Sequence, residues 1–144
     1  MVISGENSMK MFLGEYQPNI TEGNRIALPK KLREQIVGEE IILSKGFEKC
    51  VFLYDRGDWA QEWQKQAVNP ITDSKTRELK RYVFSGAVDA TVDEQGRFVV
   101  PQSLRSYAGL EKDVVVIGAG DHIELWDGEA WSLHLNKISR ELGS

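Results

Sequence analysis

The chain has 144 residues, a net charge of −4 and 41% hydrophobic residues, values that are typical of one globular domain. No apolar run approaches the roughly 20 residues that a membrane-spanning helix needs, which argues against an integral membrane protein. The first ten residues lack the apolar stretch of a secretory signal, and the single cysteine, Cys50, allows no intrachain disulfide. We therefore expect a cytoplasmic protein.

The negative charge is unevenly distributed along the chain. Residues 1–81 hold 13 basic and 12 acidic residues, whereas residues 82–144 hold 5 and 10. Two short segments, 20–33 and 75–81, each carry four basic residues against one acidic residue. Such clusters can bind a polyanion even in an acidic protein, but they are explained equally well as solvated helix faces.

The sequence contains an internal repeat with an offset of 72 residues. Identical residue types recur at this offset in the pairs Phe12/Phe84, Gly14/Gly86, Glu22/Glu94, Arg25/Arg97, Pro29/Pro101, Leu32/Leu104, Arg33/Arg105, Leu53/Leu125, Asp55/Asp127 and Trp59/Trp131. Two copies are too few for a solenoid, which needs at least three. The repeat therefore indicates one domain with pseudo-twofold symmetry.

The first copy reads as short strands, a tight turn and a short helix. Its expected elements, in chain order, are a strand within 11–16, a strand at Ile20, a turn at Thr21–Asn24, a strand at 25–28, a helix over 30–36 that ends at Gly38, and strands at 41–44 and 50–54. Pro29 suits the first turn of that helix, because the N–H that proline lacks is not needed there.

Two helices are expected to connect the copies, and the second copy repeats the order of the first. The first connecting helix would be capped by Asp58 and carry Trp59, Trp63 and Ala67 on one face. The second would be capped by Thr72, Asp73 or Ser74. The second copy predicts strands at 87–92, 97–100, 114–117 and 122–126, a helix from Pro101 to Gly109, and a C-terminal helix with Trp131, Leu135 and Ile138 on one face.

These elements predict a mainly β protein with short helices (α+β) that forms one integrated domain. Neither copy has enough strand to make a stable sheet alone, so two interleaved copies are expected to share a β-barrel. The expected organisation is a disordered extension at 1–10, a first repeat at 11–60, a helical connector at 61–82, and a second repeat with the C-terminal helix at 83–140.

The turns of the two copies differ in one informative way. In the second turn Asp93 can cap the backbone and pair with Arg97, while Gly96 can adopt a positive φ. In the first turn Thr21 replaces the acid and Asn24, which tolerates positive φ, replaces the glycine. Arg25 therefore has no matching partner and is available for an external anion, such as a phosphate or a guanine. The alternative is that both arginines only fasten their hairpins.

No arrangement of residues predicts an enzyme, a metal site or a cofactor site. His122 and His134 are 12 residues apart without partners at ligand spacing, and Cys50 lies in an apolar strand. The stretch Val114–Gly120 resembles the start of a dinucleotide-binding motif, but too few residues follow it for such a fold. We interpret Gly118–Gly120 as a hairpin turn.

Several motifs in the same order resemble the MraZ family of bacterial transcription regulators. They are Met11–Tyr16, Arg25–Arg33, Phe84–Ala87, Asp93–Arg97 and Tyr107–Lys112. The resemblance implies a pair of AbrB-like halves forming a swapped-hairpin barrel, and a ring-shaped homo-oligomer for which an octamer is favoured. It also implies nucleoid association and binding to short direct repeats of promoter DNA, with repression of the division and cell-wall gene cluster.

The family's DNA-binding signature is Asp, three residues and Arg, usually with Lys and Gly before the Arg. The second turn matches at Asp93, Gly96 and Arg97, with Gln95 in place of Lys; the first matches only at Arg25. The expected DNA-binding residues are Thr21, Asn24, Arg25, Lys30, Lys31, Arg33, Arg97 and Arg105, with Asp93 and Gly96 holding their turn. A different class of function, an oligomeric scaffold or an antitoxin-like module that binds a protein partner, remains an alternative.

Overall fold

The computed structural model describes residues 9–66, 70 and 72–143. The strands are β1 (Glu15–Tyr16), β2 (Ile20–Thr21), β3 (Arg25–Ala27), β4 (Glu40–Lys45), β5 (Val51–Asp55), β6 (Val88–Thr91), β7 (Arg97–Val99), β8 (Val114–Gly118) and β9 (Ile123–Asp127). The helices are α2 (Lys30–Arg33), α3 (Arg56–Gln66), α4 (Ser74–Ser85), α5 (Gln102–Ala108) and α6 (Gly128–Glu141). The mainly β fold with short helices is thus confirmed.

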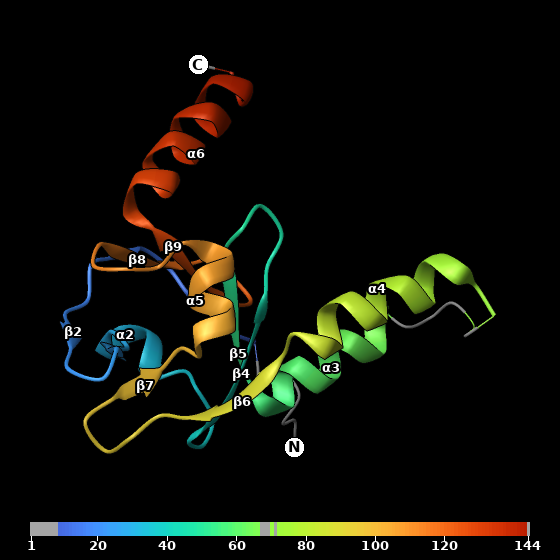
Figure 1. The fold of residues 1–144 in the computed structure, drawn as a ribbon, viewed down its shortest axis with the longest axis horizontal. Coiled ribbons are helices and arrows are strands. Elements are labelled where there is room, and N and C mark those ends of the chain that lie inside the picture. Colours follow the sequence, from blue (N-terminus) through green and yellow to red (C-terminus); the bar gives the residue numbers. More distant parts are fainter. Residues whose placement is uncertain (1–8, 67–69, 71, 144) are drawn as a thin grey trace.

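The described strands form two antiparallel sheets that both mix the two copies (Figure 1). One sheet has the order β1-β8-β9-β5-β4-β6, and the other has the order β2-β3-β7. Exchanging the copies converts β1 into β6, β8 into β4 and β9 into β5, which leaves the order of the larger sheet unchanged. The copies are therefore interleaved, as the repeat predicted.

The strand register shows the pseudo-twofold symmetry directly. In the β3–β7 pair Ile26 lies opposite Phe98, and in the β5–β9 pair Phe52 lies opposite Glu124. Each of these residues faces its own equivalent, 72 positions later in the chain. A twofold axis that relates the copies must pass through both of these pairs.

Buried side chains from both copies fill the core between the sheets and the short helices. Leu32 of α2 and Leu104 of α5, which follow the two repeated prolines, are each 1% exposed. The helix α5 ends at Gly109 with φ of 66°, as predicted. The helix α2 is shorter than the predicted 30–36, because after Arg33 the chain tightens into i→i+3 hydrogen bonds that run to Ile36.

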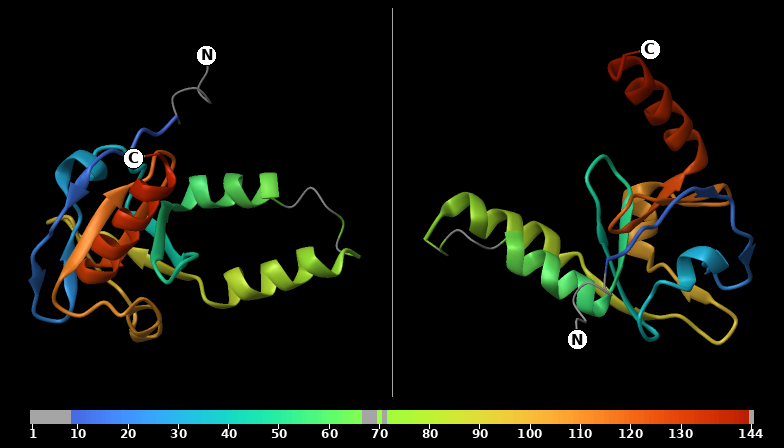
Figure 2. Two further views of the ribbon diagram at one scale, coloured as in Figure 1. Left: turned by 90° about the horizontal axis from the view of Figure 1, so that it is seen from above. Right: turned by 180° about the vertical axis from the view of Figure 1, so that it is seen from behind.

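The helices α3 and α4 form a hairpin that extends away from the sheets (Figure 2). The carboxylate of Asp55 accepts a hydrogen bond from the backbone N–H of Asp58 at 2.9 Å, so Asp55, and not Asp58 as predicted, lies at the start of α3. Asp73, one of three expected caps, accepts from the N–H of Thr76 at 2.9 Å. The predicted contact residue Ala67 lies outside the described residues.

Aromatic side chains hold this hairpin together. Trp59 and Trp63 of α3 both pack against Phe84 of α4, with ring centroids 5.7 and 5.3 Å apart.

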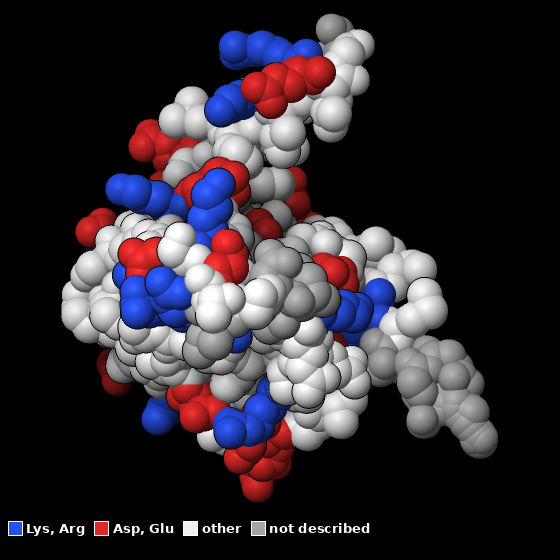
Figure 3. Space-filling model, turned by 90° about the vertical axis from the view of Figure 1, so that its right-hand side faces the viewer, with Lys and Arg blue, Asp and Glu red and all other residues white. Residues whose placement is uncertain are grey.

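The basic cluster of residues 75–81 does not form a purely positive surface, because Glu78 pairs with Arg81. Figure 3 shows Lys and Arg interspersed with Asp and Glu on this side of the molecule. The interpretation as solvated helix faces fits this cluster.

The C-terminal helix α6 also projects away from the sheets, in a different direction from the hairpin of α3 and α4 (Figure 1). Trp131 packs against Trp126 of β9 at 5.2 Å between centroids. Of the predicted apolar face, Trp131 and Ile138 are half-buried, whereas Leu135 is exposed, as is Leu133. None of the described helices has the length and apolar character that a membrane span requires.

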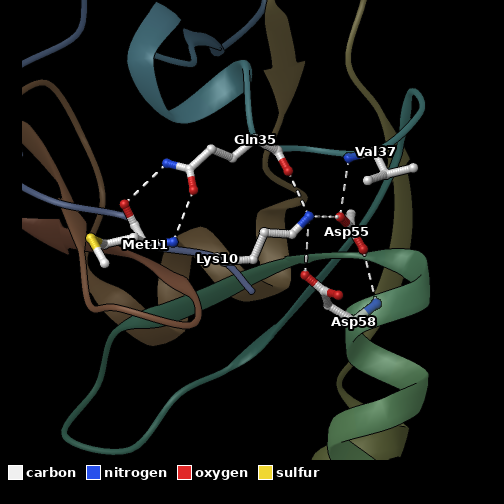
Figure 4. Close-up of polar contacts among 6 residues, drawn as sticks. All are labelled: Lys10, Met11, Gln35, Val37, Asp55 and Asp58. Carbon is white, nitrogen blue, oxygen red and sulfur yellow. Dashed lines mark hydrogen bonds and ion pairs between the residues drawn. The ribbon is translucent and has the colours of Figure 1, made fainter. Parts of the chain in front are cut away.

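We predicted that residues 1–10 form a disordered extension. Residues 1–8 lie outside the described residues, but Lys10 is held in place by the folded chain. Its ammonium group lies 2.8 Å from the carboxylate of Asp55, 3.3 Å from that of Asp58 and 2.5 Å from the carbonyl oxygen of Gln35 (Figure 4). The side chains of Lys10 and Asp55 are 6% and 3% exposed. Burial disfavours ionised Asp55, but Lys10 and the N–H groups of Asp58 and Val37 outweigh it and hold its pKa below the ordinary value. Lys10 therefore ties the N-terminal segment to the first turn of α3.

Replacing Lys10 with Met should lower the free energy of unfolding by about 3 kcal/mol, because the substitution leaves the buried Asp55 carboxylate without its cation. Urea denaturation of the wild type and the variant would measure the difference. Lys112→Met is the matched control, since Lys112 is exposed. A loss no larger than that of the control would contradict the structural role of Lys10.

Candidate nucleic-acid interface

The three-stranded sheet has a buried inner face and an open outer face. On the inner face Ile26 and Phe98 are 2% and 1% exposed. Because side chains alternate along a strand, Arg25 and Ala27 of β3 and Arg97 and Val99 of β7 lie on the outer face. Thr21 of β2 pairs with Arg25 and lies on the same face. The outer face therefore carries the arginines of both copies.

Two rows of side chains related by the pseudo-twofold axis cross this outer face. The first row is Thr21, Arg25 and Val99, because Arg25 pairs with Thr21 on one side and Val99 on the other. The second row is Asp93, Arg97 and Ala27: Arg97 pairs with Ala27, and the N–H of Asp93 donates to the carbonyl oxygen of Arg97 at 2.8 Å. Each residue of the first row has its equivalent, 72 positions away, in the second.

The second row is internally neutralised. One carboxylate oxygen of Asp93 accepts hydrogen bonds from the N–H groups of Gln95 and Arg97, both at 2.9 Å, and Gly96 has φ of 80°. The other oxygen lies 3.5 Å from Nε of Arg97. The N–H of Arg97 is the main reason that the pKa of Asp93 lies below its ordinary value. The geometry predicted for the second turn is thus present, and it keeps Arg97 beside an ionised carboxylate.

The first row has no carboxylate of its own, although Asp93 in the second row also attracts Arg25, whose charge helps to lower the pKa of Asp93. Asn24 adopts φ of 60°, as its position in the turn suggested, and Thr21 stands where the second row has the acid. Arg25 is exposed, and within the described part of the chain it forms no ion pair. It lines an open hollow together with Asp89 and Asp93, whose carboxylates pair with Arg56 and Arg97 respectively. Of the two repeated arginines, Arg25 is the more exposed and has no ion pair within 4 Å among the described residues, so it is the better candidate to bind an external anion.

The two turns lie at opposite ends of the three-stranded sheet. The β3–β7 pair is antiparallel, so the turn before Arg25 and the turn before Arg97 extend in opposite directions. One chain therefore cannot direct both turn tips to the same point. The two arginine side chains nevertheless start from neighbouring positions of one face.

The remaining predicted residues fall into two groups. Lys30 and Lys31 are exposed on α2, immediately after β3. Arg33 instead donates to the carbonyl oxygen of Glu94 at 3.1 Å and covers Gly96, where an added Cβ would lie 2.8 Å from its guanidinium. Arg105 donates to the carbonyl oxygen of Val100 and the side chain of Gln102, at 3.1 and 2.8 Å. Arg33 and Arg105 therefore hold the local backbone.

Val99 is a surface residue that the sequence analysis did not single out. It is 44% exposed and lies directly beside Arg25, although it belongs to the other copy. The sequence does indicate that Val99 shares a face with Arg97, because residues i and i+2 of a strand lie on the same face. The proximity to Arg25 could not be inferred without the pairing of β3 with β7.

Other candidate chemistry lies away from this face. The thiol of Cys50 is buried, and burial raises its pKa, as befits an unreactive core residue. Gly118 to Gly120 form the turn between β8 and β9, as we predicted, with the N–H of Ala119 donating to the carbonyl oxygen of His122. His122 lies between the carboxylates of Asp121 and Glu124, each at 2.8 Å. The described residues contain no group of three or more side chains suited to a metal ion.

Comparison with known proteins identifies the family. The family described as "MraZ protein, putative antitoxin-like" matches this chain twice, at residues 11–82 and 83–142. A transcriptional regulator MraZ from Acetivibrio thermocellus is 44% identical over 121 residues, which are 84% of each chain. Those from Heliobacterium modesticaldum and Micrococcus luteus are 43% and 40% identical over 129 and 125 residues, or 90% and 87% of each chain. The chain therefore belongs to the MraZ family, a family of transcriptional regulators and not of enzymes.

Proposed function

We propose that this protein regulates transcription by sequence-specific binding of double-stranded promoter DNA, with Arg25 contacting a base edge in the major groove. The observation that carries the proposal is the difference between the two rows of the outer face. Arg97 is beside the carboxylate of Asp93, whereas Arg25 is exposed and has Thr21 in the equivalent position. A guanidinium can donate two parallel hydrogen bonds to guanine, the commonest specific contact in DNA recognition.

Phosphate contacts would come from the neighbouring helix. Lys30 and Lys31 begin α2 shortly after β3 and are exposed, so they can neutralise phosphates beside the groove that Arg25 enters. Thr21 and Asn24 border Arg25 in the first turn and can donate further hydrogen bonds. This local positive charge would act despite the net charge of −4 of the whole chain.

A single base-contacting arginine per chain would bind DNA weakly, and we propose that self-association supplies the rest of the affinity. A ring-shaped homo-oligomer, with an octamer as the favoured size, would repeat the first row at a regular spacing and match short direct repeats. Linked sites raise the effective concentration of each next contact. Exposed leucines on α6, Leu133 and Leu135, support self-association. The proposed role is repression of the division and cell-wall gene cluster at the nucleoid.

A protein-interaction module is the second candidate, because the description of the family includes the term antitoxin-like and α6 carries the exposed leucines Leu133 and Leu135. In that case Arg25 would be buried between subunits or against a partner.

Limited accessibility of an Arg25→Cys variant to a thiol reagent in the assembled protein would favour this second function. Full accessibility would favour DNA binding, and the buried Cys50 provides the internal reference.

Replacing Arg25 with Ala should weaken binding to a selected promoter duplex by about 1–3 kcal/mol for each engaged chain, the usual value of a bidentate base contact. Gel-shift titration would measure the change. Arg25→Lys keeps the positive charge but lacks the two parallel donors of the guanidinium, so its affinity should lie between those of Arg25→Ala and the wild type. Arg81→Ala, on the exposed side of α4, is the matched control. Equal affinity of Arg25→Ala and the wild type would remove Arg25 from the site.

The affinity should fall steeply with salt concentration, because each phosphate contact releases a bound counterion. The double variant Lys30→Ala, Lys31→Ala should reduce the slope of log affinity against log salt by about 2 for each engaged chain, since each contact contributes roughly 0.9. Fluorescence anisotropy between low and moderate salt would give both slopes. An unchanged slope would show that these lysines do not touch phosphates.

A further inference from the structure

We propose that Val99 is a second base-reading residue of the DNA site and contacts the C5-methyl group of a thymine next to the guanine that Arg25 contacts. The inference rests on the proposed DNA-binding function and extends it, because it assigns a specificity role to the second copy of the repeat. Its starting point is the 44% exposure of an apolar side chain in the centre of the candidate interface.

The register places Val99 and Arg25 side by side. They form a direct cross-strand pair between β7 and β3, so their Cβ atoms are about 5 Å apart. Successive bases of one DNA strand are about 3.4 Å apart along the axis. An arginine and a valine at this separation can therefore contact neighbouring bases of one groove. In the major groove the methyl group of thymine is the feature that an apolar side chain reads.

The comparison of the two rows gives independent support. The equivalents of Thr21, Arg25 and Val99 in the second row are Asp93, Arg97 and Ala27. The row that lacks the acid, and whose arginine has no ion pair within 4 Å among the described residues, also carries the larger apolar side chain. The row that neutralises its arginine carries alanine. Both differences concentrate base-reading groups on the first row, as is expected if that row makes the base contacts of the face.

Strand propensity alone is a weaker explanation of Val99. Valine favours strands, and single exposed apolar residues are common. Propensity would favour a β-branched residue equally at the equivalent position, which is Ala27. It also gives no reason for the larger side chain to lie beside the more exposed arginine. A contact with a base methyl explains both the residue type and the row in which it occurs.

The test replaces thymine with deoxyuridine, which removes only the methyl group. A binding site is first selected from random duplexes with the full-length protein. The guanine that Arg25 contacts is identified as the guanine whose replacement no longer weakens binding by the Arg25→Ala variant. Each thymine within two base pairs of this guanine is then replaced with deoxyuridine, one at a time. The wild type should bind one of these dU duplexes about fourfold more weakly than the dT duplex, the effect of burying one methyl-sized group. Val99→Ala should bind the dT and dU duplexes equally, with wild-type affinity for the dU duplex to within about twofold.

Two further variants keep the result interpretable. Val99→Thr preserves the β-branched shape and one of the two γ-methyl groups, so it should keep a preference for dT that is smaller than that of the wild type. Val37→Ala removes an exposed valine outside the sheet and should keep the full preference. A Val99→Ala protein that still prefers dT fourfold, or a wild type indifferent to every replacement, overturns the role of Val99 alone. A wild type that selects no duplex overturns the proposed function and this inference together.

Discussion

The antiparallel pairing of β3 with β7 is the constraint on which the rest of the structure depends. It joins the two copies at a point where Ile26 faces its own equivalent, Phe98, and buries both. Burying this pair fixes the register, because a slip by one residue would bring the apolar side chains to solvent. The same register places the two arginines on the outer face. Core packing and the candidate interface thus result from one set of strand contacts, and a substitution that shifts the pairing would disturb both.

Much of this arrangement could be predicted from the sequence because its causes are local or repeated. The positive φ of Asn24 and Gly96 follows from residues that tolerate it, and the end of α5 follows from Gly109. The 72-residue repeat predicted that the copies interleave. The early end of α2 could not be predicted in the same way. There the backbone carbonyl of Gln35 accepts from Lys10, and its side-chain amide bonds to Met11, contacts made by residues about 25 positions away.

In the candidate site too, features with a local cause could be predicted from the sequence, and features that depend on distant contacts could not. The availability of Arg25 was predictable, because it follows from Thr21 standing where the second turn has Asp93. The backbone contacts of Arg33 and Arg105 were not, because each binds carbonyl groups whose position depends on the folded chain. Their DNA-binding role stays a prediction. A basic residue in a short charged segment looks the same in sequence whether it faces solvent or covers a turn. Only the pairing of the copies shows that Arg33 of the first lies over Gly96 of the second.

The difference between the two turns also explains how one arginine can lack a paired carboxylate in its own turn at little cost to the stability of the fold. The pair of Asp93 and Arg97 is partly exposed, and exposed ion pairs contribute about 0–1 kcal/mol to stability. Replacing the acid by Thr21 in the first turn therefore costs the fold little, provided that Asn24 still supports the positive φ. Keeping the acid in the second turn retains a fastened hairpin whose backbone N–H groups are satisfied by Asp93. A duplicated domain can in this way keep one turn for stability and use the other for recognition, because the twofold axis already places Arg25 and Val99, from different copies, beside each other.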